Sequence, residues 1–306
     1  MHDAIIIGAG PAGLNAALIL GRCRRRVLVF DSGKPRNAAS QGLHGFLSRD
    51  GTHPMRLRAK GRDEIARYET VEFRDVPVTG AERIEGGFEV RLSDDTVERA
   101  RLLLLATGRI DVMPEIEGFR EFYGKGIYHC PYCDGGENRD RPIAIVGHDE
   151  SAASLAQGLL VWSRELTLCT AGEKPAWSRE TGAVLERAGV RVVSEHVRRV
   201  EGRDRCERLV FDDREPLAVG AVFFCSDCLQ KSTLPERLGC EFDPDGNVRC
   251  KGNAATNVPG LFVAGNVRGG IHLAIMAAAE GAEAGIAMNE HLLDADVAAG
   301  RFASRG

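Results

Sequence analysis

The sequence predicts an α/β protein built from two Rossmann-like, three-layer nucleotide-binding domains. A short apolar strand, a glycine-rich turn, a helix and a second strand follow one another over residues 4–31, and the same order returns over residues 142–169. A further strand and a long alanine-rich helix are left over after residue 258. We therefore expect a discontinuous first domain, residues 1–112 and 243–306, with a second domain, residues 113–242, inserted into it.

The composition is typical of a globular, soluble chain. Of its 306 residues 43% are hydrophobic and 27% are charged, and the net charge is only −4, so neither nucleic acid nor a membrane is an expected partner. The arginines within residues 22–26 fall at the end of the first predicted helix, where cations oppose the helix dipole. The N-terminus lacks the regions of a signal peptide, and apolar runs such as residues 102–106 are too short to span a bilayer. We expect a cytoplasmic protein whose nine cysteines mostly stay reduced, with at least one pair catalytic, metal-binding or buried.

Hydrophobic periodicity predicts the other elements in order. Between the two glycine turns we expect a loop at 35–55, a helix around 55–67, a strand at 71–79 and a hairpin of strands 86–92 and 96–105. The second unit is expected to hold a strand at 143–146, a helix at 150–163, and strands at 165–169, 190–194, 197–201, 206–211 and 218–225. A strand at 261–264 and a helix from about 273 to 293 complete the chain.

The first glycine turn has the pattern of a dinucleotide-binding site. Gly8, Gly10 and Gly13 fit the spacing GxGxxG, and Asp31 follows 23 residues after Gly8, at the end of the next strand. Gly8 permits a tight turn, Gly10 lets a pyrophosphate approach the backbone, and Gly13 lets the helix pack closely on the sheet. The helix N-terminus then offers its N–H groups to phosphate, and Asp31 can accept hydrogen bonds from a ribose. The motif by itself does not distinguish FAD from NAD.

A second motif, CPYC at residues 130–133, predicts thiol chemistry. Cys130 and Cys133 are close enough in sequence to form a disulfide that opens and closes, and Asp134 follows directly as a candidate acid or base. The alternative is a zinc site shared with Cys225 and Cys228. Cys133 and Cys225 are 92 positions apart, whereas paired zinc motifs are usually about 15–20 residues apart. We therefore predict no metal site and interpret Cys225 and Cys228 as bystanders.

On the basis of these motifs, the sequence resembles the low-molecular-weight thioredoxin reductase family over nearly its whole length. The shared segments come in the family's order: GAGPAG at 8–13, ATG at 106–108, CPYCDG at 130–135, the second glycine turn, VPGLFVAGN at 258–266 and the helix from about 272. The resemblance implies bound FAD, a homodimer, and a thioredoxin-like protein or a small dithiol or disulfide as the partner. It also implies that Cys133 faces the flavin, that Cys130 attacks the partner, and that Asp134 is the acid/base.

The same resemblance implies which residues contact FAD. Besides the first turn, the loop after Asp31 together with CPYC resembles the dithiol-oxidase branch of the family, in which His44 would lie near the flavin. The expected cofactor-binding residues are Gly8, Gly10, Pro11, Ala12, Gly13, Asp31, Ser32, Arg36, Asn37, His44, Ala106, Thr107, Gly108, Gly265, Asn266, His272, Leu273 and Ala274.

The second glycine turn departs from the family pattern. Gly147 is present, but Asp149 stands where a glycine would admit the pyrophosphate, and Glu150 adds a second negative charge. The strand ending at Cys169 carries neither an acid for a ribose nor the family's HRR arginines, so we expect NADPH to be used poorly. On the flavin side, Asn266 stands where the family has an aspartate, and His272-Leu273 stands where it has Arg-Gln. We expect flavin binding to tolerate these changes more easily than nicotinamide binding tolerates Asp149.

Several functional hypotheses follow. The leading one is an FAD-dependent thiol–disulfide oxidoreductase that exchanges electrons among a dithiol or disulfide substrate, the Cys130–Cys133 pair and FAD, with oxygen or a non-nicotinamide carrier as the other partner. One alternative is an NAD(P)H-dependent thioredoxin reductase. Others are a second domain that binds a second flavin or docks a ferredoxin-type donor, and a non-catalytic flavin redox sensor.

Overall fold

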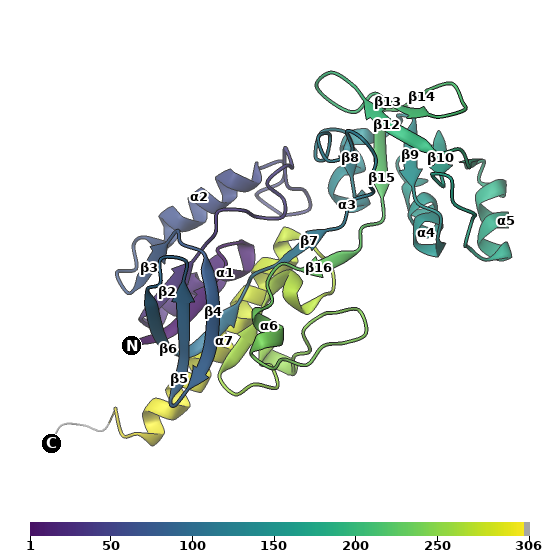
Figure 1. Ribbon diagram of the computed structural model, residues 1–306. Coiled ribbons are helices and arrows are strands. Elements are labelled where there is room, and N and C mark those ends of the chain that lie inside the picture. Colours follow the sequence, from purple (N-terminus) through teal and green to yellow (C-terminus); the bar gives the residue numbers. More distant parts are fainter. Residues whose placement is uncertain (303–306) are drawn as a thin grey trace. The chain divides into compact units, whose positions relative to one another are not determined.

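The computed structural model describes residues 1–302, and the chain divides into two compact units. Unit 1 comprises Met1–Ala38, Pro54–Ile110 and the chain from Leu229 onward, and unit 2 comprises Ala39–His53 and Asp111–Cys228. Each is an α/β body of its own (Figure 1). Strands β7 (Arg109–Asp111) and β16 (Cys228–Gln230) lie at the crossings between the units and pair with each other.

Unit 1 is built on a seven-stranded sheet. Its strands are β1 (His2–Ile7), β2 (Val27–Phe30), β3 (Val71–Arg74), β4 (Val78–Ile84), β5 (Gly87–Leu92), β6 (Val97–Leu105) and β17 (Leu261–Val263). The order is β3-β2-β1-β6-β5-β4, and β17 pairs with the later part of β6. Strands β3, β2, β1, β6 and β17 are parallel, whereas β4, β5 and β6 form an antiparallel meander.

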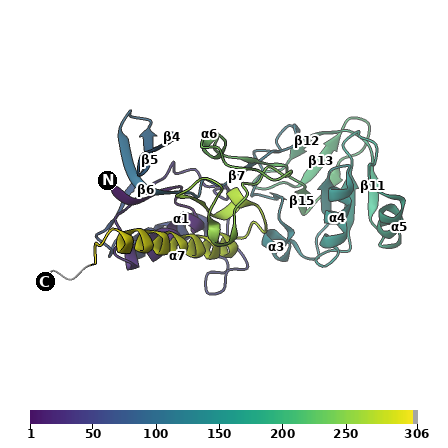
Figure 2. The same cartoon turned by 90° about the horizontal axis from the view of Figure 1, so that it is seen from below.

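Helices and apolar side chains cover both faces of this sheet. The helices are α1 (Pro11–Arg22), α2 (Pro54–Ile65), the one-turn α6 (Leu234–Arg237), the 3₁₀ turns η2 (Gly252–Ala254) and η3 (Gly265–Arg268), and α7 (Ala274–Ala298). Figure 2 shows α7 beside α1. The two helices approach closely because α7 has glycine at the contact: a Cβ on Gly281 would lie 2.0 Å from the Ala12 carbonyl oxygen. Residues of β1 and β2 are buried on both faces, as parallel strands between helix layers require.

Unit 2 contains a five-stranded parallel sheet in the order β11-β10-β9-β15-β8. The strands are β8 (Ile127–Tyr128), β9 (Ile143–Val146), β10 (Leu166–Cys169), β11 (Arg191–Val193) and β15 (Ala221–Phe224). A smaller antiparallel sheet holds β12 (Val197–Glu201), β13 (Arg208–Phe211) and β14 (Leu217–Ala218). The helices are α3 (Pro131–Asp134), the 3₁₀ turn η1 (Gly136–Asn138), α4 (Glu150–Leu159) and α5 (Arg179–Arg187).

The predicted α/β class and both β-α-β units are confirmed, and several boundaries differ. The expected strand at 71–79 is two strands, β3 and β4, separated near Pro77, which has no N–H to donate to a ladder. The strand at 218–225 is likewise divided at Gly220 into β14 and β15, and the helix expected to reach 163 ends at Leu159. Helix α7 extends to Ala298 instead of ending near 293.

The division of the chain differs from the expected 113–242 insert in two places. The segment 229–242 belongs to unit 1, where Gln230 Nε2 donates to the Gly246 carbonyl at 2.9 Å and Lys231 Nζ donates to the Lys34 carbonyl. Residues 39–53 belong to unit 2, although they lie between β2 and α2 in sequence. Long-range contacts of this kind have no signature in local periodicity. Residues 303–306 of the expected first domain lie outside the described residues.

Candidate functional site

The first glycine turn has the close contacts that its motif predicts. Gly8 has φ of +108°, and a Cβ there would lie 2.3 Å from the Ala106 carbonyl oxygen. A Cβ on Gly13 would lie 1.8 Å from the Gly8 carbonyl oxygen, so α1 can start against the strand only if both positions are glycine. A Cβ on Gly10 would meet no atom of the described residues within 4 Å, which leaves the backbone open to a ligand.

The N-terminus of α1 has no cap from the described side chains. Gly10 is the N-cap residue and Pro11 follows as the first helical residue, so no side-chain oxygen occupies the N–H groups of the first turn. Unpaired N–H groups and the positive end of the helix dipole together favour an anion. This turn is therefore suited to a phosphate-containing group.

The other predicted cofactor positions in unit 1 meet at one edge of its sheet. Strands β1, β2, β6 and β17 are parallel, so the loops after their carboxyl ends lie along the same edge, where open α/β sheets bind ligands. The loop after β2 carries Ser32, Arg36 and Asn37, the turn after β6 carries Ala106, Thr107 and Gly108, and the region after β17 carries Gly265, Asn266, His272, Leu273 and Ala274.

Polar groups at this edge are suited to a dinucleotide. Thr107 Oγ1 is buried and has no hydrogen-bond partner within residues 1–302, so a polar ligand atom can satisfy it. Arg36 Nη1 lies 2.8 Å from His272 Nδ1, which joins the first and last of the predicted loops. The Gly265 N–H already donates to Glu280 Oε2 at 2.8 Å, so a ligand near Gly265 would have to use other groups of that turn.

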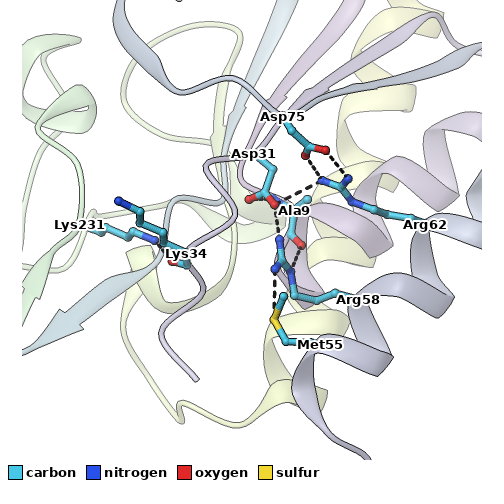
Figure 3. A network of polar contacts seen from close by, with 8 residues as sticks. All are labelled: Ala9, Asp31, Lys34, Met55, Arg58, Arg62, Asp75 and Lys231. Atoms are coloured by element: carbon cyan, nitrogen blue, oxygen red, sulfur yellow. Dashed lines mark hydrogen bonds and ion pairs between the residues drawn. The ribbon is translucent and has the colours of Figure 1, made fainter. Parts of the chain in front are cut away.

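Asp31 is the centre of a buried charge network (Figure 3). Its Oδ2 accepts from Arg58 and, at 3.3 Å, from Arg62, while its Oδ1 accepts from the Ala9 N–H at 3.4 Å. Arg58 also donates from Nε to the Ala9 carbonyl at 3.1 Å and so ties α2 to the glycine turn. Since a carboxylate offers about four acceptor positions, Asp31 retains room for a ribose hydroxyl. The sequence motif identified Asp31 but not the two arginines, because α2 contributes them from a distant segment.

Replacing Arg58 with Met is expected to lower the free energy of unfolding by about 3 kcal/mol, because a carboxylate that is 8% exposed would lose its main partner. Urea denaturation measures this. Arg62→Met is the matched control: its side chain is 28% exposed and mainly pairs with the exposed Asp75, so the expected loss is about 1 kcal/mol or less. Equal losses for the two variants would show that Arg58 does not anchor Asp31.

The CPYC segment follows β8 and forms a disulfide. Cys130 and Cys133 are bonded, with their Cα atoms 5.2 Å apart. Cys130 is the N-cap of α3, and its Sγ accepts from the Cys133 N–H at 3.1 Å. A helix N-terminus stabilises a negative charge on sulfur, so a Cys130 thiolate would be favoured when the bond is reduced. Both residues are half-buried, while Tyr132 between them is 78% exposed.

Asp134 ends α3 beside this disulfide. The pKa of its carboxyl is raised to about 7, chiefly by burial and in addition by the negative charge of Glu137, while His44 acts in the opposite direction. A group that titrates near neutral pH can both take and return a proton. Its main chain is fixed as well, because Asn138 Nδ2 donates to the Asp134 carbonyl at 2.7 Å.

His44 lies in unit 2. Its Nε2 is 3.5 Å from Glu137 Oε1, and its Nδ1 is 3.5 Å from Asp50 Oδ1. The sequence predicted a flavin contact for His44, and that role stays a prediction. Motif matching alone does not identify its pairing with Glu137.

A polar chain adjoining CPYC was missed by the sequence analysis. His129 Nδ1 lies 2.8 Å from the Tyr123 hydroxyl, which donates to Asp111 Oδ2 at 2.9 Å. Cys228 Sγ in turn lies 3.4 Å from Asp111 Oδ1. His129 directly precedes Cys130, and this adjacency in HCPYC was the only sequence signal for the chain.

At the second glycine turn, a side chain of the following segment accepts a hydrogen bond from the helix N-terminus. Asp149 is the N-cap of α4, where its Oδ1 accepts from the Ala152 N–H at 2.9 Å and from the Ser151 hydroxyl at 2.7 Å. These hydrogen bonds lower the pKa of Asp149, so it is charged at neutral pH. Glu150 accepts from the Ser178 N–H at 2.8 Å and from the Thr181 hydroxyl. The helix end that would hold a pyrophosphate thus carries a carboxylate of the protein.

Other cysteines are poor candidates for exchange. Burial raises the pKa of Cys169 and Cys206 to about 12 and that of Cys240 to about 11, which disfavours their thiolates. Cys225, at the carboxyl end of β15, also has its pKa raised by burial. Within residues 1–302, no group of three or more His, Cys, Asp or Glu side chains is placed to hold a metal ion. In the same range no helix is long and apolar enough to cross a membrane.

Residues 2–281 match the family model for pyridine nucleotide-disulphide oxidoreductases. A probable thioredoxin reductase of Arthroderma benhamiae is 32% identical over 297 residues, covering 87% of this chain and 74% of that protein. Among solved structures, HlmI gives a TM-score of 0.93 at 36% identity and covers 98% of this chain and 95% of that one. A putative thioredoxin reductase TrxB of Bacillus anthracis gives 0.91 at 32%, covering 96% and 99%.

The family match spans both glycine turns and the CPYC disulfide, and the structural likeness extends over almost the whole chain. Membership implies bound FAD, which agrees with the open turn at Gly10 and the buried Thr107 hydroxyl. The chain belongs to the pyridine nucleotide-disulphide oxidoreductase family and is a flavin disulfide oxidoreductase of the thioredoxin-reductase-like kind.

Proposed function

We propose that this enzyme exchanges electrons between a dithiol or disulfide substrate and FAD through Cys130 and Cys133, and that its other electron partner is oxygen or a carrier other than NADPH. The observation that carries this proposal is the contrast between the two glycine turns. The N-terminus of α1 is open at Gly10, whereas that of α4 is capped by the charged Asp149. A pyrophosphate at the second turn would have to displace this carboxylate from its hydrogen bonds and overcome its repulsion.

The proposed exchange has two thiol–disulfide steps. A thiolate of the substrate attacks the Cys130 sulfur, the bond between Cys130 and Cys133 breaks, and Cys133 leaves with the electron pair as a thiolate. The second substrate thiol loses its proton and attacks the substrate sulfur bound to Cys130, which closes the substrate disulfide and releases the Cys130 thiolate. Two electrons then reside on the cysteine pair, and FAD, when bound, would supply the two-electron oxidation that restores the Cys130–Cys133 disulfide.

Asp134 moves the proton in these steps. With its pKa raised to about 7, the carboxyl can accept a proton from the second substrate thiol and can return one to a departing thiolate. The same steps in reverse order, carried out by the same residues, reduce a disulfide substrate. In this proposal the partner's thiolate attacks the Cys130 sulfur.

An anaerobic titration of the flavin-loaded enzyme tests the electron partner. We expect dithiothreitol to bleach the flavin stoichiometrically, and NADPH to do so at least about 100-fold more slowly, because a carboxylate occupies its phosphate position. Rapid and stoichiometric bleaching by NADPH, without bleaching by dithiols, would refute the proposal in favour of an NAD(P)H-dependent thioredoxin reductase.

Asp149→Gly is expected to raise the rate of flavin reduction by NADPH about tenfold, because the helix end becomes available to phosphate. Loss of the Asp149 cap should lower the free energy of unfolding by only a few tenths of a kcal/mol, since glycine is tolerated at an N-cap. Gly10→Asp is the matched variant in the first turn and is expected to abolish FAD retention during purification. An NADPH rate that stays unchanged in Asp149→Gly would show that this cap is not what limits nicotinamide use.

The names of the relatives support a candidate partner, and the family resemblance supports a candidate assembly. Several are named thioredoxin reductases, which favours a thioredoxin-like protein as one candidate thiol partner besides small dithiols. We further propose a homodimer in the cytoplasm, on the basis of the family resemblance.

A further inference from the structure

Three titratable side chains, those of Glu137, His44 and Asp50, form a cluster that adjoins the end of α3 through Glu137. Asp134 is the last residue of α3, the next residue Gly135 is helical (φ −65°, ψ −38°), and Glu137 follows in η1. The two carboxylates are therefore three positions apart on a helical backbone, a spacing that makes side chains neighbours. His44 Nε2 lies 3.5 Å from Glu137 Oε1, and Asp50 Oδ1 lies 3.5 Å from His44 Nδ1. The ring of His44 therefore lies between two carboxylates.

Hydrogen bonds fix the two chain segments that carry this cluster. Asn138, which is 2% exposed, donates to the Asp134 carbonyl at 2.7 Å and accepts from Arg205 Nη2 at 3.1 Å, which fixes the turn that carries Glu137. On the other side Leu43 is buried and its N–H donates to the Thr52 carbonyl at 2.9 Å. Asp50 Oδ1 also accepts from the Gly45 N–H at 2.9 Å, so the loop that presents His44 is closed on itself.

An aromatic neighbour of α3 brings no charge. The ring of Trp162, in the turn after α4, packs against Gly135, where a Cβ would lie 2.7 Å from the indole Cδ2. The same ring meets Tyr132 edge-on, with 5.7 Å between ring centroids. Besides burial, the charges that act on the Asp134 carboxyl are those of Glu137 and His44, and Asp50 contacts His44.

We propose that Glu137 and His44 are a pair of positioning residues that bias the Asp134 carboxyl in opposite directions, and that this balance determines when Asp134 holds the proton of thiol exchange. The inference rests on the proposed function, in which Asp134 serves the Cys130–Cys133 pair. Glu137 favours the protonated carboxyl by like-charge repulsion, whereas a protonated His44 favours the carboxylate, both directly and by neutralising Glu137. Neither residue needs to touch the substrate to exert this effect.

The experiment is a carboxyl titration of the flavin-loaded enzyme by ¹³C NMR with labelled aspartate, in which Asp134→Asn assigns the Asp134 signal. We expect the midpoint to move down by about half a pH unit or more in Glu137→Gln and up by a similar amount in His44→Gln. Glu173→Gln removes an exposed carboxylate elsewhere in unit 2 and should leave the midpoint unchanged. The pH profile of anaerobic flavin reduction by dithiothreitol should shift in the same two directions.

Shifts of the Asp134 midpoint in opposite directions exclude a merely structural role, because a loosened site would shift the midpoint in the same direction in both variants. A midpoint that fails to move in either variant, or that moves in the same direction in both, overturns the inference. If dithiols do not reduce the flavin although the two midpoints shift as expected, the proposed function fails while the electrostatic pairing stands. If dithiols reduce the flavin with the wild-type pH profile in both variants, the function stands and the pairing fails.

Discussion

Cys130→Ser is expected to lower dithiol-dependent flavin reduction by at least about 10³-fold, because a serine hydroxyl neither forms the disulfide nor replaces a thiolate nucleophile. Cys133→Ser should have a similar effect, since the remaining sulfur would have no resolving partner. The flavin site lies at the sheet edge of unit 1 in the proposed assignment, so both variants should retain FAD. Stopped-flow absorbance under anaerobic conditions measures the rate, and the flavin spectrum measures the cofactor content.

The second CxxC provides the matched control for this prediction. Cys225 and Cys228 have the same spacing as Cys130 and Cys133 but form no disulfide within residues 1–302. Cys225→Ser should reduce flavin at a rate within about twofold of wild type, because Cys225 lies outside CPYC and substitutions away from a site usually change little. Undiminished turnover in Cys130→Ser with every thiol substrate would instead support a flavin-loaded sensor that does not exchange thiols.

Asp134→Asn should stabilise the protein at alkaline pH. Burial raises the pKa of this carboxyl from 3.8 to about 7, and a shift of that size is linked to a folding free energy of up to about 4 kcal/mol. Between pH 4 and 7 the folded protein binds a proton that the unfolded chain has released, so wild-type stability falls as pH rises and the loss is complete above the folded pKa. Asparagine has the same shape and does not ionise, and it avoids this loss.

Urea denaturation at pH 4 and pH 8 measures the effect. We expect the two proteins to have similar stability at pH 4, and the variant to gain a few kcal/mol over wild type at pH 8. Asp94→Asn is the control of opposite sign: hydrogen bonds from Thr96 lower the pKa of this exposed carboxyl, so its replacement should give no gain at pH 8. A constant difference between Asp134→Asn and wild type across the range would show that the Asp134 proton is not coupled to folding.

These expectations connect stability with function at one residue. A carboxylic acid beside the disulfide is useful only if it exchanges its proton near neutral pH, and burial produces that property by destabilising the charged form. The same burial lowers the stability of the folded protein above the raised pKa. Asp134→Asn is thus expected to be more stable at pH 8 and slower in thiol exchange, which is a common relation between stability and activity.

Much of the site could be predicted because its chemistry is local in sequence. The first glycine turn requires small residues at fixed spacings, and the structure has the close contacts that this spacing implies at Gly8 and Gly13. Cys130 and Cys133 form a disulfide because a one-turn helix brings residues three apart together. Asp149 was predicted to crowd the second turn. The structure adds that it caps α4, a role consistent with its residue type and its place before a helix.

The chain's own contacts across long sequence separations could not be predicted in this way. Arg58 reaches Asp31 from α2, and Lys231 joins residues 229–242 to unit 1 rather than to the insert. His44 reaches Glu137 across 93 positions, from a loop that has no periodic pattern. Such pairs depend on how the sheets and loops pack, and no spacing rule encodes them.

By itself, then, the sequence determined the α/β class, the two β-α-β units, the open first turn, the capped second turn and the disulfide pair, because each depends on backbone geometry within a few residues. Only the tertiary structure decided which side chains surround those groups: the arginines on Asp31, the polar chain that includes His129, and the pair of His44 and Glu137 that adjoins α3. The physical reason is that conformational preference acts locally, whereas burial and electrostatic interaction act through space between segments that only folding brings together.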